Sequence, residues 1–325
     1  MSDFVLSLPS DPGLREAVGE IPGVEIVMWD LDGEAPRDRF DMVVPAYEGG
    51  SRPLANLAGV EVRLVQWQSI GFNAVTRYLP EGLAFANATT VHETATSELA
   101  VALALAAQRD IPRYVRNGDE HRWDRVMSEG LADRRVLLVG YGGIGKAIEA
   151  RLAGFEVSVT RLARTARDER NLAGETVRVH GLEAFPSLLP DADIVMVAVP
   201  LSEDTKGLIG AAELAALPNG ALVVNVGRGP VVVTDALVAE LSAGRLRAAL
   251  DVTDPEPLPE DHPLWRLPNA IIVPHAGGDT TAMLPRVVAL IKRQIEHLRR
   301  GEPVENLVFG EQPACADPPS LTMRV

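Results

Sequence analysis

The sequence contains little cysteine and no long apolar run. Its one cysteine, Cys315, excludes both an internal disulfide and a cysteine-based metal site, and we expect no bound metal. No stretch of about 18 apolar residues is present to span a membrane. The first nine residues also lack the basic and apolar regions of a secretory signal. These absences predict a soluble, cytoplasmic protein.

Positive charge is scarce as well. The 325 residues include 31 basic against 45 acidic side chains, which gives a formal net charge of −14 at pH 7. A surface so acidic disfavours nucleic acid and anionic membranes, so we expect neither as a partner. A small anionic substrate would need a local group of cations to enter such a protein.

Short apolar runs alternate with helical patterns along most of the chain. This alternation predicts parallel sheets with helices on both faces. Strands are expected at 4–8, 24–29, 42–45, 63–67, 83–87, 136–139, 157–160, 194–199, 221–226, 247–252 and 270–273. Helices are expected at 11–21, 93–108, 146–153 and 281–300. The helix at 93–108 is apolar nearly all round, which predicts that it is buried.

A glycine-rich segment follows the expected strand at 136–139. Its six residues, Gly140-Tyr141-Gly142-Gly143-Ile144-Gly145, match G-x-G-x-x-G, and a helical pattern comes next. In this motif the first glycine permits a tight turn, the second admits the pyrophosphate and the third lets the helix pack on the strand. The phosphates would lie on the helix N-terminus, where free N–H groups and the dipole favour negative charge. We therefore predict that these six residues bind a dinucleotide.

The strand after the glycine motif is expected to end beside the ribose of the cofactor. NAD sites place a carboxylate there, about 20 residues after the first glycine. This chain instead has Arg161, with Arg164 three residues later. Guanidinium groups suit the 2′-phosphate of NADP, to which they donate charge-assisted bonds. The sequence thus predicts that Arg161 and Arg164 favour NADP; NAD remains the alternative, with both arginines in solvent.

Three later segments place ionisable residues after apolar strands. Arg228 follows the strand near 221–226, Glu256 follows the strand near 247–252 and His275 follows the strand near 270–273. Ligands of an open α/β sheet bind at the carboxyl ends of its strands, so the three side chains are expected to converge. Arg228 can hold a carboxylate and polarise a carbonyl. His275 can transfer a proton, and Glu256 beside it would favour the imidazolium.

The chain resembles the D-isomer-specific 2-hydroxyacid dehydrogenases. The matching stretches lie between Val136 and Gly278 and read VLLVGYGGIG, VPLSEDTKGLIG, LPNGALVVNVGRG, ALDVTDPEPLPEDHPLW and LPNAIIVPHAGG. The N-terminal region matches mainly through Gln68-Ser69-Ile70-Gly71-Phe72 and the helix that carries Glu98. The resemblance implies an oxidoreductase that uses a nicotinamide cofactor to interconvert a small 2-oxo acid and a D-2-hydroxy acid.

The resemblance also implies an α/β fold with two doubly wound parallel-sheet domains. A Rossmann cofactor domain, 103–279, would be inserted into a flavodoxin-like substrate domain made of 1–102 and 280–325. The composition of the tail after about residue 310, rich in proline and small residues, predicts disorder. Members of the family are usually dimers, and the apolar helix at 93–108 agrees with a homodimer.

The resemblance assigns roles to individual residues. It implies that Arg228, Glu256 and His275 are catalytic, and that the N–H groups of Ile70 and Gly71 bind the substrate carboxylate, with Arg228 and His275 as further substrate contacts. Asp251 would contact the nicotinamide amide. Further cofactor contacts are implied at Pro200, Thr205, Val226 and Gly277. Asn73 stands where the family more often has Asp, so the 2-oxo acid, of the glyoxylate or hydroxypyruvate type, stays open.

Two other functions fit the same pattern. A dinucleotide-sensing protein without catalysis would need the glycine motif but no proton donor, so the presence of His275 favours an enzyme. A formate or phosphite dehydrogenase on a similar scaffold is the second alternative. Turnover of a panel of small acids would separate these functions.

Overall fold

The computed structural model describes residues 4–313 and divides them into two compact units. Unit 1 contains residues 4–92 and 281–313, and unit 2 contains Glu93–Thr280. Unit 2 thus begins ten residues earlier than the expected start at 103, because the helix at 93–108 packs within it. Most of the tail for which disorder was predicted, 314–325, lies outside the described residues.

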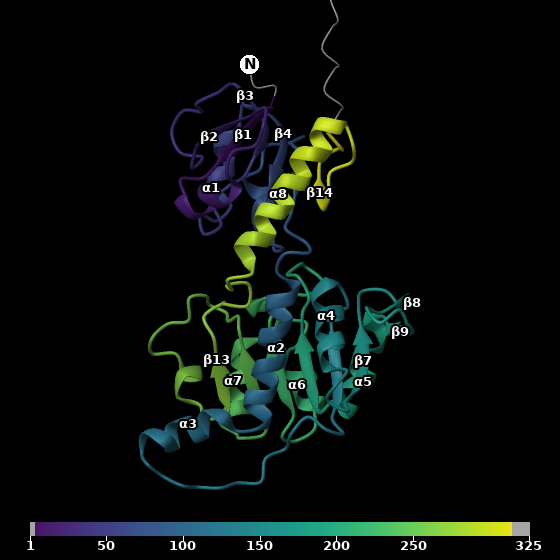
Figure 1. Cartoon of the computed structure of the whole chain (residues 1–325). Coiled ribbons are helices and arrows are strands. Elements are labelled where there is room, and N and C mark those ends of the chain that lie inside the picture. Colours follow the sequence, from purple (N-terminus) through teal and green to yellow (C-terminus); the bar gives the residue numbers. More distant parts are fainter. Residues whose placement is uncertain (1–3, 314–325) are drawn as a thin grey trace, which may run out of the picture. The chain divides into compact units, whose positions relative to one another are not determined.

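Unit 1 is built on a six-stranded sheet (Figure 1). Its strands are β1 (Phe4–Leu8), β2 (Val24–Met28), β3 (Arg39–Val43), β4 (Glu61–Gln66), β5 (Phe85–Ala86) and β14 (Leu307–Phe309). The order β14-β5-β4-β3-β1-β2 contains five parallel strands in the flavodoxin-like order 2-1-3-4-5. Strand β14 pairs antiparallel with β5 at the edge. The expected flavodoxin-like sheet is therefore confirmed.

Two helices, α1 (Pro12–Val18) and α8 (Met283–Arg300), contribute to one core of unit 1. Helix α8 buries Val287, Ile291 and Ile295 at helical spacing among the side chains of β1. Burial of each such aliphatic side chain contributes about 1.5–3 kcal/mol. The last long helix therefore returns to complete the core that the first strand begins.

Unit 2 is built on an eight-stranded sheet. Its strands are β6 (Arg135–Val139), β7 (Ser158–Leu162), β8 (Arg167–Arg170), β9 (Thr176–His180), β10 (Ile194–Val197), β11 (Leu222–Asn225), β12 (Arg247–Leu250) and β13 (Ala270–Ile272). Seven are parallel in the order β9-β7-β6-β10-β11-β12-β13, a Rossmann order extended by one strand. Because β6 and β10 are neighbours, the order reverses beside the glycine motif.

The helices of unit 2 cover its sheet (Figure 1). They are α2 (Glu93–Gln108), α3 (Ile111–Asp119), α4 (Gly143–Leu152), α5 (Phe185–Leu188), α6 (Ala211–Ala216) and α7 (Thr234–Ser242). Short 3₁₀ helices lie at Arg52–Leu57 and Val75–Arg77 in unit 1 and at Leu182–Ala184, Leu189–Asp191, Gly229–Val231 and Pro263–Arg266 in unit 2. Helix α2 packs between α4 and strands β11 and β12, which explains its apolar composition. Within residues 4–313 no helix is long and apolar enough to cross a membrane.

Several elements of unit 2 were not predicted from the sequence. They are the helices α3, α5, α6 and α7, the 3₁₀ helices, and the antiparallel pair β8–β9, called here the charged hairpin. Strand β8 reads RDER and has no apolar alternation, so periodicity could not reveal it. Its turn is closed by Asn171, whose Oδ1 accepts the N–H groups of Ala173 and Glu175. Charge along this edge strand disfavours pairing with another chain.

Candidate active site

Three ionisable side chains follow the carboxyl ends of neighbouring strands in unit 2. Arg228 lies after β11, Glu256 after β12 and His275 after β13. Since these strands are parallel, their carboxyl ends lie along one edge of the sheet. Glu256 and His275 are in direct contact, and Arg228 lies near enough for its charge to act on both. The structure therefore brings the three predicted residues together.

Glu256 and His275 share a hydrogen bond of 2.5 Å between Oε1 and Nδ1. This bond raises the pKa of His275 above its usual value, although burial and the charge of Arg228 oppose the shift. The same bond lowers the pKa of Glu256. Because an ionised carboxylate only accepts hydrogen bonds, Nδ1 carries a proton. Nε2 is then the ring nitrogen that can exchange a proton with a ligand.

Asp251 organises the turn that carries His275. Its carboxylate is buried and accepts the N–H groups of Ala276 at 2.8 Å and Gly277 at 3.1 Å. Its backbone carbonyl accepts the N–H of His275 at 2.8 Å. Burial raises the pKa of Asp251 and these N–H donors oppose the shift. A Cβ at Gly277 would lie 2.6 Å from Oδ2 of Asp251, so the close contact requires glycine.

The backbone on both sides of Arg228 lies very close to the ends of neighbouring strands. A Cβ at Gly227 would lie 2.7 Å from the carbonyl oxygen of Val199, and at Gly229 it would lie 1.9 Å from that of Thr253. Buried Asn225 at the end of β11 fixes the turn, because it accepts the N–H of Gly227 and donates to the carbonyl of Arg228. Asn225 was not among the residues predicted from the sequence, although a polar residue inside an apolar strand could have indicated it.

The glycine loop, residues 140–145, fits a dinucleotide. A Cβ at Gly140 would lie 2.7 Å from Ala198, and at Gly145 it would lie 2.1 Å from the carbonyl oxygen of Gly140. At Gly142 a Cβ would meet no protein atom within 4 Å. Gly140 and Gly145 are thus required by the protein itself, whereas Gly142 adjoins open space at the N-terminus of α4, which has no side-chain cap. This is the backbone arrangement that accepts a pyrophosphate.

The side chain of Arg161 is hydrogen-bonded to another side chain of the protein, Glu149. It lies inside β7, and its Nε donates to Oε1 of Glu149 on α4 at 2.7 Å. The hydroxyl of Tyr141, in the glycine loop, also donates to Glu149, and the Arg161 guanidinium lies 5.9 Å from the Tyr141 ring centroid. Burial, with the bond to Glu149, raises the pKa of Tyr141 to about 12. The Arg161 side chain is only 18% exposed, so Glu149 already matches its charge.

Two other arginines follow β7 and are more exposed than Arg161. Arg164 is 72% exposed and lies 3.4 Å from Asp204. Arg167 begins the charged hairpin, pairs with Glu169 at 2.7 Å and donates to the backbone carbonyl of Tyr141 at 3.2 Å. The charged hairpin is therefore hydrogen-bonded to the glycine loop, a contact that no sequence pattern indicated.

The loop after β10 contains two of the expected cofactor contacts. Thr205 Oγ1 donates to the carbonyl of Pro200 at 2.7 Å and accepts the N–H of Ser202 at 2.8 Å. The single proton of its hydroxyl is thus used to close the loop. Val226 is buried directly after β11. The structure places all of these beyond strand ends at the carboxyl edge, and their contact with a cofactor stays a prediction.

In unit 1 the predicted carboxylate-binding residues, Ile70 and Gly71, lie in the loop after β4. Both are half-buried. The Asn87 side chain donates to the carbonyl of Ile70 at 2.9 Å, and the Trp67 ring donates to that of Gly71 at 3.0 Å. Phe72 packs edge-on against Phe309, 5.4 Å between ring centroids, which gives it a supporting role.

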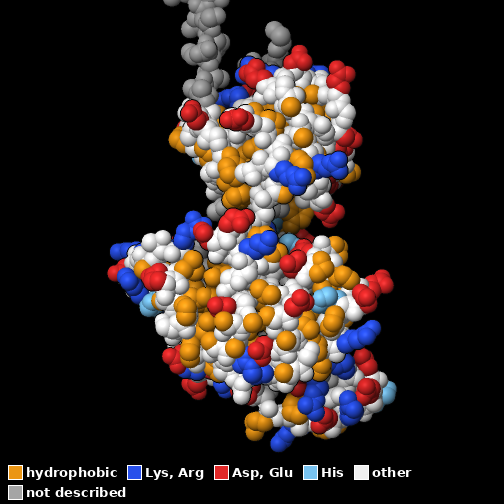
Figure 2. Space-filling view, turned by 180° about the vertical axis from the view of Figure 1, so that it is seen from behind, with side chains coloured by type: hydrophobic (Ala, Val, Ile, Leu, Met, Phe, Trp, Pro, Cys, Tyr) orange, Lys and Arg blue, Asp and Glu red, His pale blue; other side chains and the backbone are white. Residues whose placement is uncertain are grey.

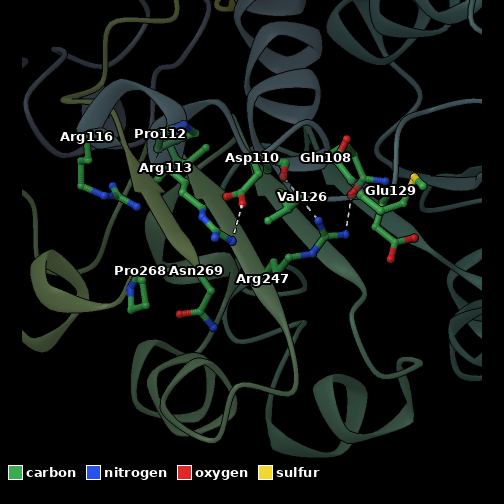
Figure 3. Close-up of a pocket in the computed structure, with 14 residues that line it drawn as sticks. Gln108, Asp110, Pro112, Arg113, Arg116, Val126, Glu129, Arg247, Pro268 and Asn269 are labelled. Carbon is green, nitrogen blue, oxygen red and sulfur yellow. Dashed lines mark hydrogen bonds and ion pairs between the residues drawn. The ribbon is translucent and has the colours of Figure 1, made fainter. Parts of the chain in front are cut away.

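A separate cavity of about 520 Å³ lies in unit 2 (Figure 3). It is lined by the end of α2, by α3, by residues 126–129 and by the starts of β12 and β13. Figure 3 shows Arg247 pointing to Gln108 and Arg113 pointing to Asp110. Because Arg247 begins β12, this cavity adjoins the amino ends of the strands, opposite to the edge that carries His275.

The sequence matches one family model. Residues 101–277 match the model described as "D-isomer specific 2-hydroxyacid dehydrogenase, NAD binding domain". The chain is 32% identical to the glyoxylate reductase/hydroxypyruvate reductase of Mus musculus over 82% of this chain and 85% of that protein. It is 30% identical to the Homo sapiens protein of the same name over 89% of this chain and 92% of that protein.

The fold matches solved structures over nearly its whole length. A D-isomer specific 2-hydroxyacid dehydrogenase from Xanthobacter autotrophicus Py2, in complex with NADPH and MES, aligns with a TM-score of 0.78 at 30% identity. The alignment covers 95% of this chain and 98% of that chain.

Proposed function

The chain belongs to the D-isomer specific 2-hydroxyacid dehydrogenase family, and from this premise we propose that it reduces a small 2-oxo acid of the glyoxylate or hydroxypyruvate type with NADPH. It is an oxidoreductase of CH–OH groups that uses a nicotinamide cofactor. The observation that carries the proposal is the His275–Glu256 pair beside Arg228 at the carboxyl edge of the sheet.

Each residue of the catalytic cluster, Arg228, Asp251, Glu256 and His275, has a distinct task. The guanidinium of Arg228 binds the substrate carboxylate and polarises the 2-oxo group, where negative charge develops. His275 Nε2 donates a proton to the oxygen that becomes the hydroxyl. Glu256 keeps His275 protonated through the raised pKa, and fixes the ring orientation. In the reverse direction neutral His275 accepts the same proton.

The cofactor supplies the hydride when it is bound. We assign its pyrophosphate to the N–H groups of the glycine loop, and its nicotinamide amide to Asp251. The carboxylate of Asp251 keeps lone pairs beyond its two backbone bonds, so it can accept one more donor. On this assignment unit 2 is the cofactor domain and unit 1 the discontinuous substrate domain.

Steady-state turnover tests this function directly. Glyoxylate, hydroxypyruvate, pyruvate and phenylpyruvate would be tested as oxidants of NADPH and NADH, with formate and phosphite as reductants of NADP and NAD. We expect at least one 2-oxo acid to be reduced and neither formate nor phosphite to be oxidised. Tight NADPH binding without any turnover would contradict the proposal and favour a sensor.

We further propose that preference for NADPH depends on Arg164 and Arg167, while Arg161 positions the glycine loop through Glu149. Arg161 is buried against a carboxylate, whereas Arg164 is exposed and Arg167 touches the glycine loop. The similar Xanthobacter structure contains NADPH, which supports the same cofactor here. A charge-assisted contact to phosphate is worth roughly 1.5–3 kcal/mol, so each should give about a tenfold preference or more.

The charged hairpin supplies a matched control for this test. Arg178 pairs with Asp168 on β8, and alternation along the strands places it on the opposite face from Arg167. Arg167→Gln should weaken NADPH binding about tenfold, measured as Kd by fluorescence, and leave NADH binding nearly unchanged. Arg178→Gln should alter neither Kd. Equal Kd values for NADPH and NADH in the parent protein would contradict the preference.

We also propose that the chain forms a homodimer through α3 and the loop after it. Four apolar side chains there are exposed, among them Trp123 and Met127 at 99% and Val115 at 60%. Hydrophobic side chains protrude at the lower end of unit 2 in Figure 2, where Figure 1 places this segment. Exposed apolar groups gathered in one stretch favour a partner. Light scattering should give a dimer, and Trp123→Ser with Met127→Ser should give a monomer; a monomeric parent would refute the proposal.

A further inference from the structure

The loop 68–72, called here the substrate loop, has four consecutive carbonyl groups that unit 1 holds by hydrogen bonds. The carbonyl of Gln68 accepts from His92 Nε2 at 2.7 Å, and that of Ser69 accepts from the N–H of Ala88 at 3.0 Å. The carbonyl of Ile70 accepts from Asn87 Nδ2 at 2.9 Å, and that of Gly71 accepts from Trp67 Nε1 at 3.0 Å. Three of the four donors are side chains. They come from the end of β4 and from the segment after β5.

Each held carbonyl fixes the direction of the next amide. The peptide unit is planar and trans, so the N–H of one residue points opposite to the C=O of the residue before it. The N–H groups of Ser69, Ile70, Gly71 and Phe72 therefore point away from the groups that hold the carbonyls. Within residues 4–313 these four N–H groups donate to no protein acceptor. A row of oriented amides is a binding surface for an anion.

We propose that Asn87 and His92 are positioning residues that hold the substrate loop so that its amides receive the substrate carboxylate. Asn87 fixes the N–H of Gly71, and His92 fixes the N–H of Ser69. The inference rests on the proposed reduction of a 2-oxo acid. In this proposal Asn87 and His92 do not contact the substrate or the cofactor. They act by holding the backbone of the substrate loop in place.

Asn87 is itself fixed in one orientation. Its Oδ1 accepts the N–H of Thr89 at 3.2 Å and the hydroxyl of Thr89 at 2.9 Å, so Nδ2 is the atom directed to Ile70. Asn306, just before β14, donates to the carbonyl of Thr89 at 2.8 Å and accepts the N–H of Asn87 at 3.2 Å. The returning chain thus braces the residue that holds the substrate loop.

His92 is fixed by a bond and by a ring contact. It is 5% exposed, and its ring stacks on Tyr47 with 5.8 Å between centroids and 13° between planes. Because a carbonyl oxygen only accepts, the bond to Gln68 requires a proton on Nε2 of His92. The two contacts can be separated experimentally, since one substitution preserves the donor and another preserves the ring.

The test compares His92→Gln with His92→Phe in the full chain with saturating NADPH. Gln places an amide donor near the position of Nε2 but loses the ring; Phe keeps the stacked ring but cannot donate. The proposal predicts that His92→Phe raises KM for glyoxylate, or for whichever 2-oxo acid the parent prefers, about 3- to 10-fold with kcat within about twofold. His92→Gln should stay within about twofold of the parent in both constants. A larger KM for His92→Gln than for His92→Phe, or parental values for both, would overturn the proposal.

Asn87→Asp tests the positioning role of Asn87 independently. The substitution keeps the acceptor for Thr89 and replaces the donor to Ile70 with a negative charge, which repels both the carbonyl and the incoming carboxylate. We expect KM to rise about tenfold or more, with NADPH Kd unchanged because unit 2 binds the cofactor. The Kd of oxamate for the NADPH complex, measured by calorimetric titration, should rise by the same factor. Unchanged oxamate affinity in Asn87→Asp would overturn the proposal, whereas failure of the parent to reduce any 2-oxo acid would instead refute the proposed function.

Discussion

The catalytic cluster of unit 2 and the substrate loop of unit 1 differ in the groups that we expect each to present to a ligand. In the catalytic cluster these groups are the side chains of Arg228, Glu256 and His275. The turns that carry them are held by side chains bonded to backbone: the Asp251 carboxylate accepts two N–H groups, and Asn225 bonds to Gly227 and Arg228. In the substrate loop the backbone amides are available to a ligand, and buried side chains position them. Sequence motifs indicate the first arrangement, because its chemistry depends on residue types. They do not indicate the second, because any residue can supply a backbone amide.

The largest effect should come from the proton donor of the catalytic cluster. His275→Ala removes the group that protonates the 2-oxo oxygen, so kcat should fall about a hundredfold or more. The fold and the NADPH Kd should persist, because backbone atoms and Asp251 form the surrounding turn. Stopped-flow measurement of hydride transfer checks this. A kcat near that of the parent would assign the proton to another group and break the contrast with the substrate loop.

Arg228→Lys should have the next largest effect. An ammonium cannot reproduce the planar pair of donors that binds a carboxylate and polarises the neighbouring carbonyl. We expect both a higher KM and a lower kcat for the 2-oxo acid, each by about tenfold. Steady-state kinetics at saturating NADPH measure this, with Arg178→Lys on the charged hairpin as the control. Parental constants for Arg228→Lys would make Arg228 a structural residue.

Gly142→Ala tests a site where the backbone itself faces the ligand. The added Cβ meets no protein atom within 4 Å, so Tm should not change. It would occupy the space through which the pyrophosphate approaches, so the NADPH Kd should rise about tenfold or more. In the matched variant, Gly145→Ala, the Cβ would lie 2.1 Å from the carbonyl oxygen of Gly140, so Tm itself should fall. If Gly142→Ala binds NADPH normally, the pyrophosphate does not approach this glycine.

The smallest effect concerns pH. Glu256 raises the pKa of His275, and reduction needs the protonated ring, so kcat/KM for reduction should fall as pH rises through that pKa. Glu256→Gln removes the negative charge and keeps the shape of the side chain. The kcat/KM of Glu256→Gln for reduction should therefore fall at a lower pH than that of the parent. The pH profile for oxidation of the D-2-hydroxy acid should also shift to lower pH. A profile that stays in place would show that another charge sets the pKa of His275.

The sequence predicted most of the strands, and it predicted that Arg228, Glu256 and His275 come together. Strand 4–8 and helix 93–108 were predicted with the bounds that the structure has, because their apolar patterns are strong and their ends are marked. The charged hairpin escaped prediction because charged residues occupy both faces of β8. Helix α3 also escaped, since it follows α2 after two residues and is mostly polar.

Residues that act through another group were the hardest to predict. Arg161 occupies the position expected to read the ribose, yet nothing in the linear sequence pairs it with Glu149, twelve residues earlier on a helix face. Asn87 and His92 carry no motif, and their importance comes only from the carbonyls that they reach. Such contacts depend on how strand ends and loops are placed in three dimensions. Local periodicity does not contain that information.

The return of α8 and β14 to unit 1 has a consequence for the order in which the protein matures during synthesis. Unit 2 spans Glu93 to Thr280, or 280 − 93 + 1 = 188 residues, and can fold once these residues have left the ribosome. Unit 1 lacks Val287, Ile291 and the brace at Asn306 until the whole inserted unit has been translated. At about 5–20 residues per second this delay is about 10–40 s. We therefore expect the nascent strands of unit 1 to remain without part of their core for this time.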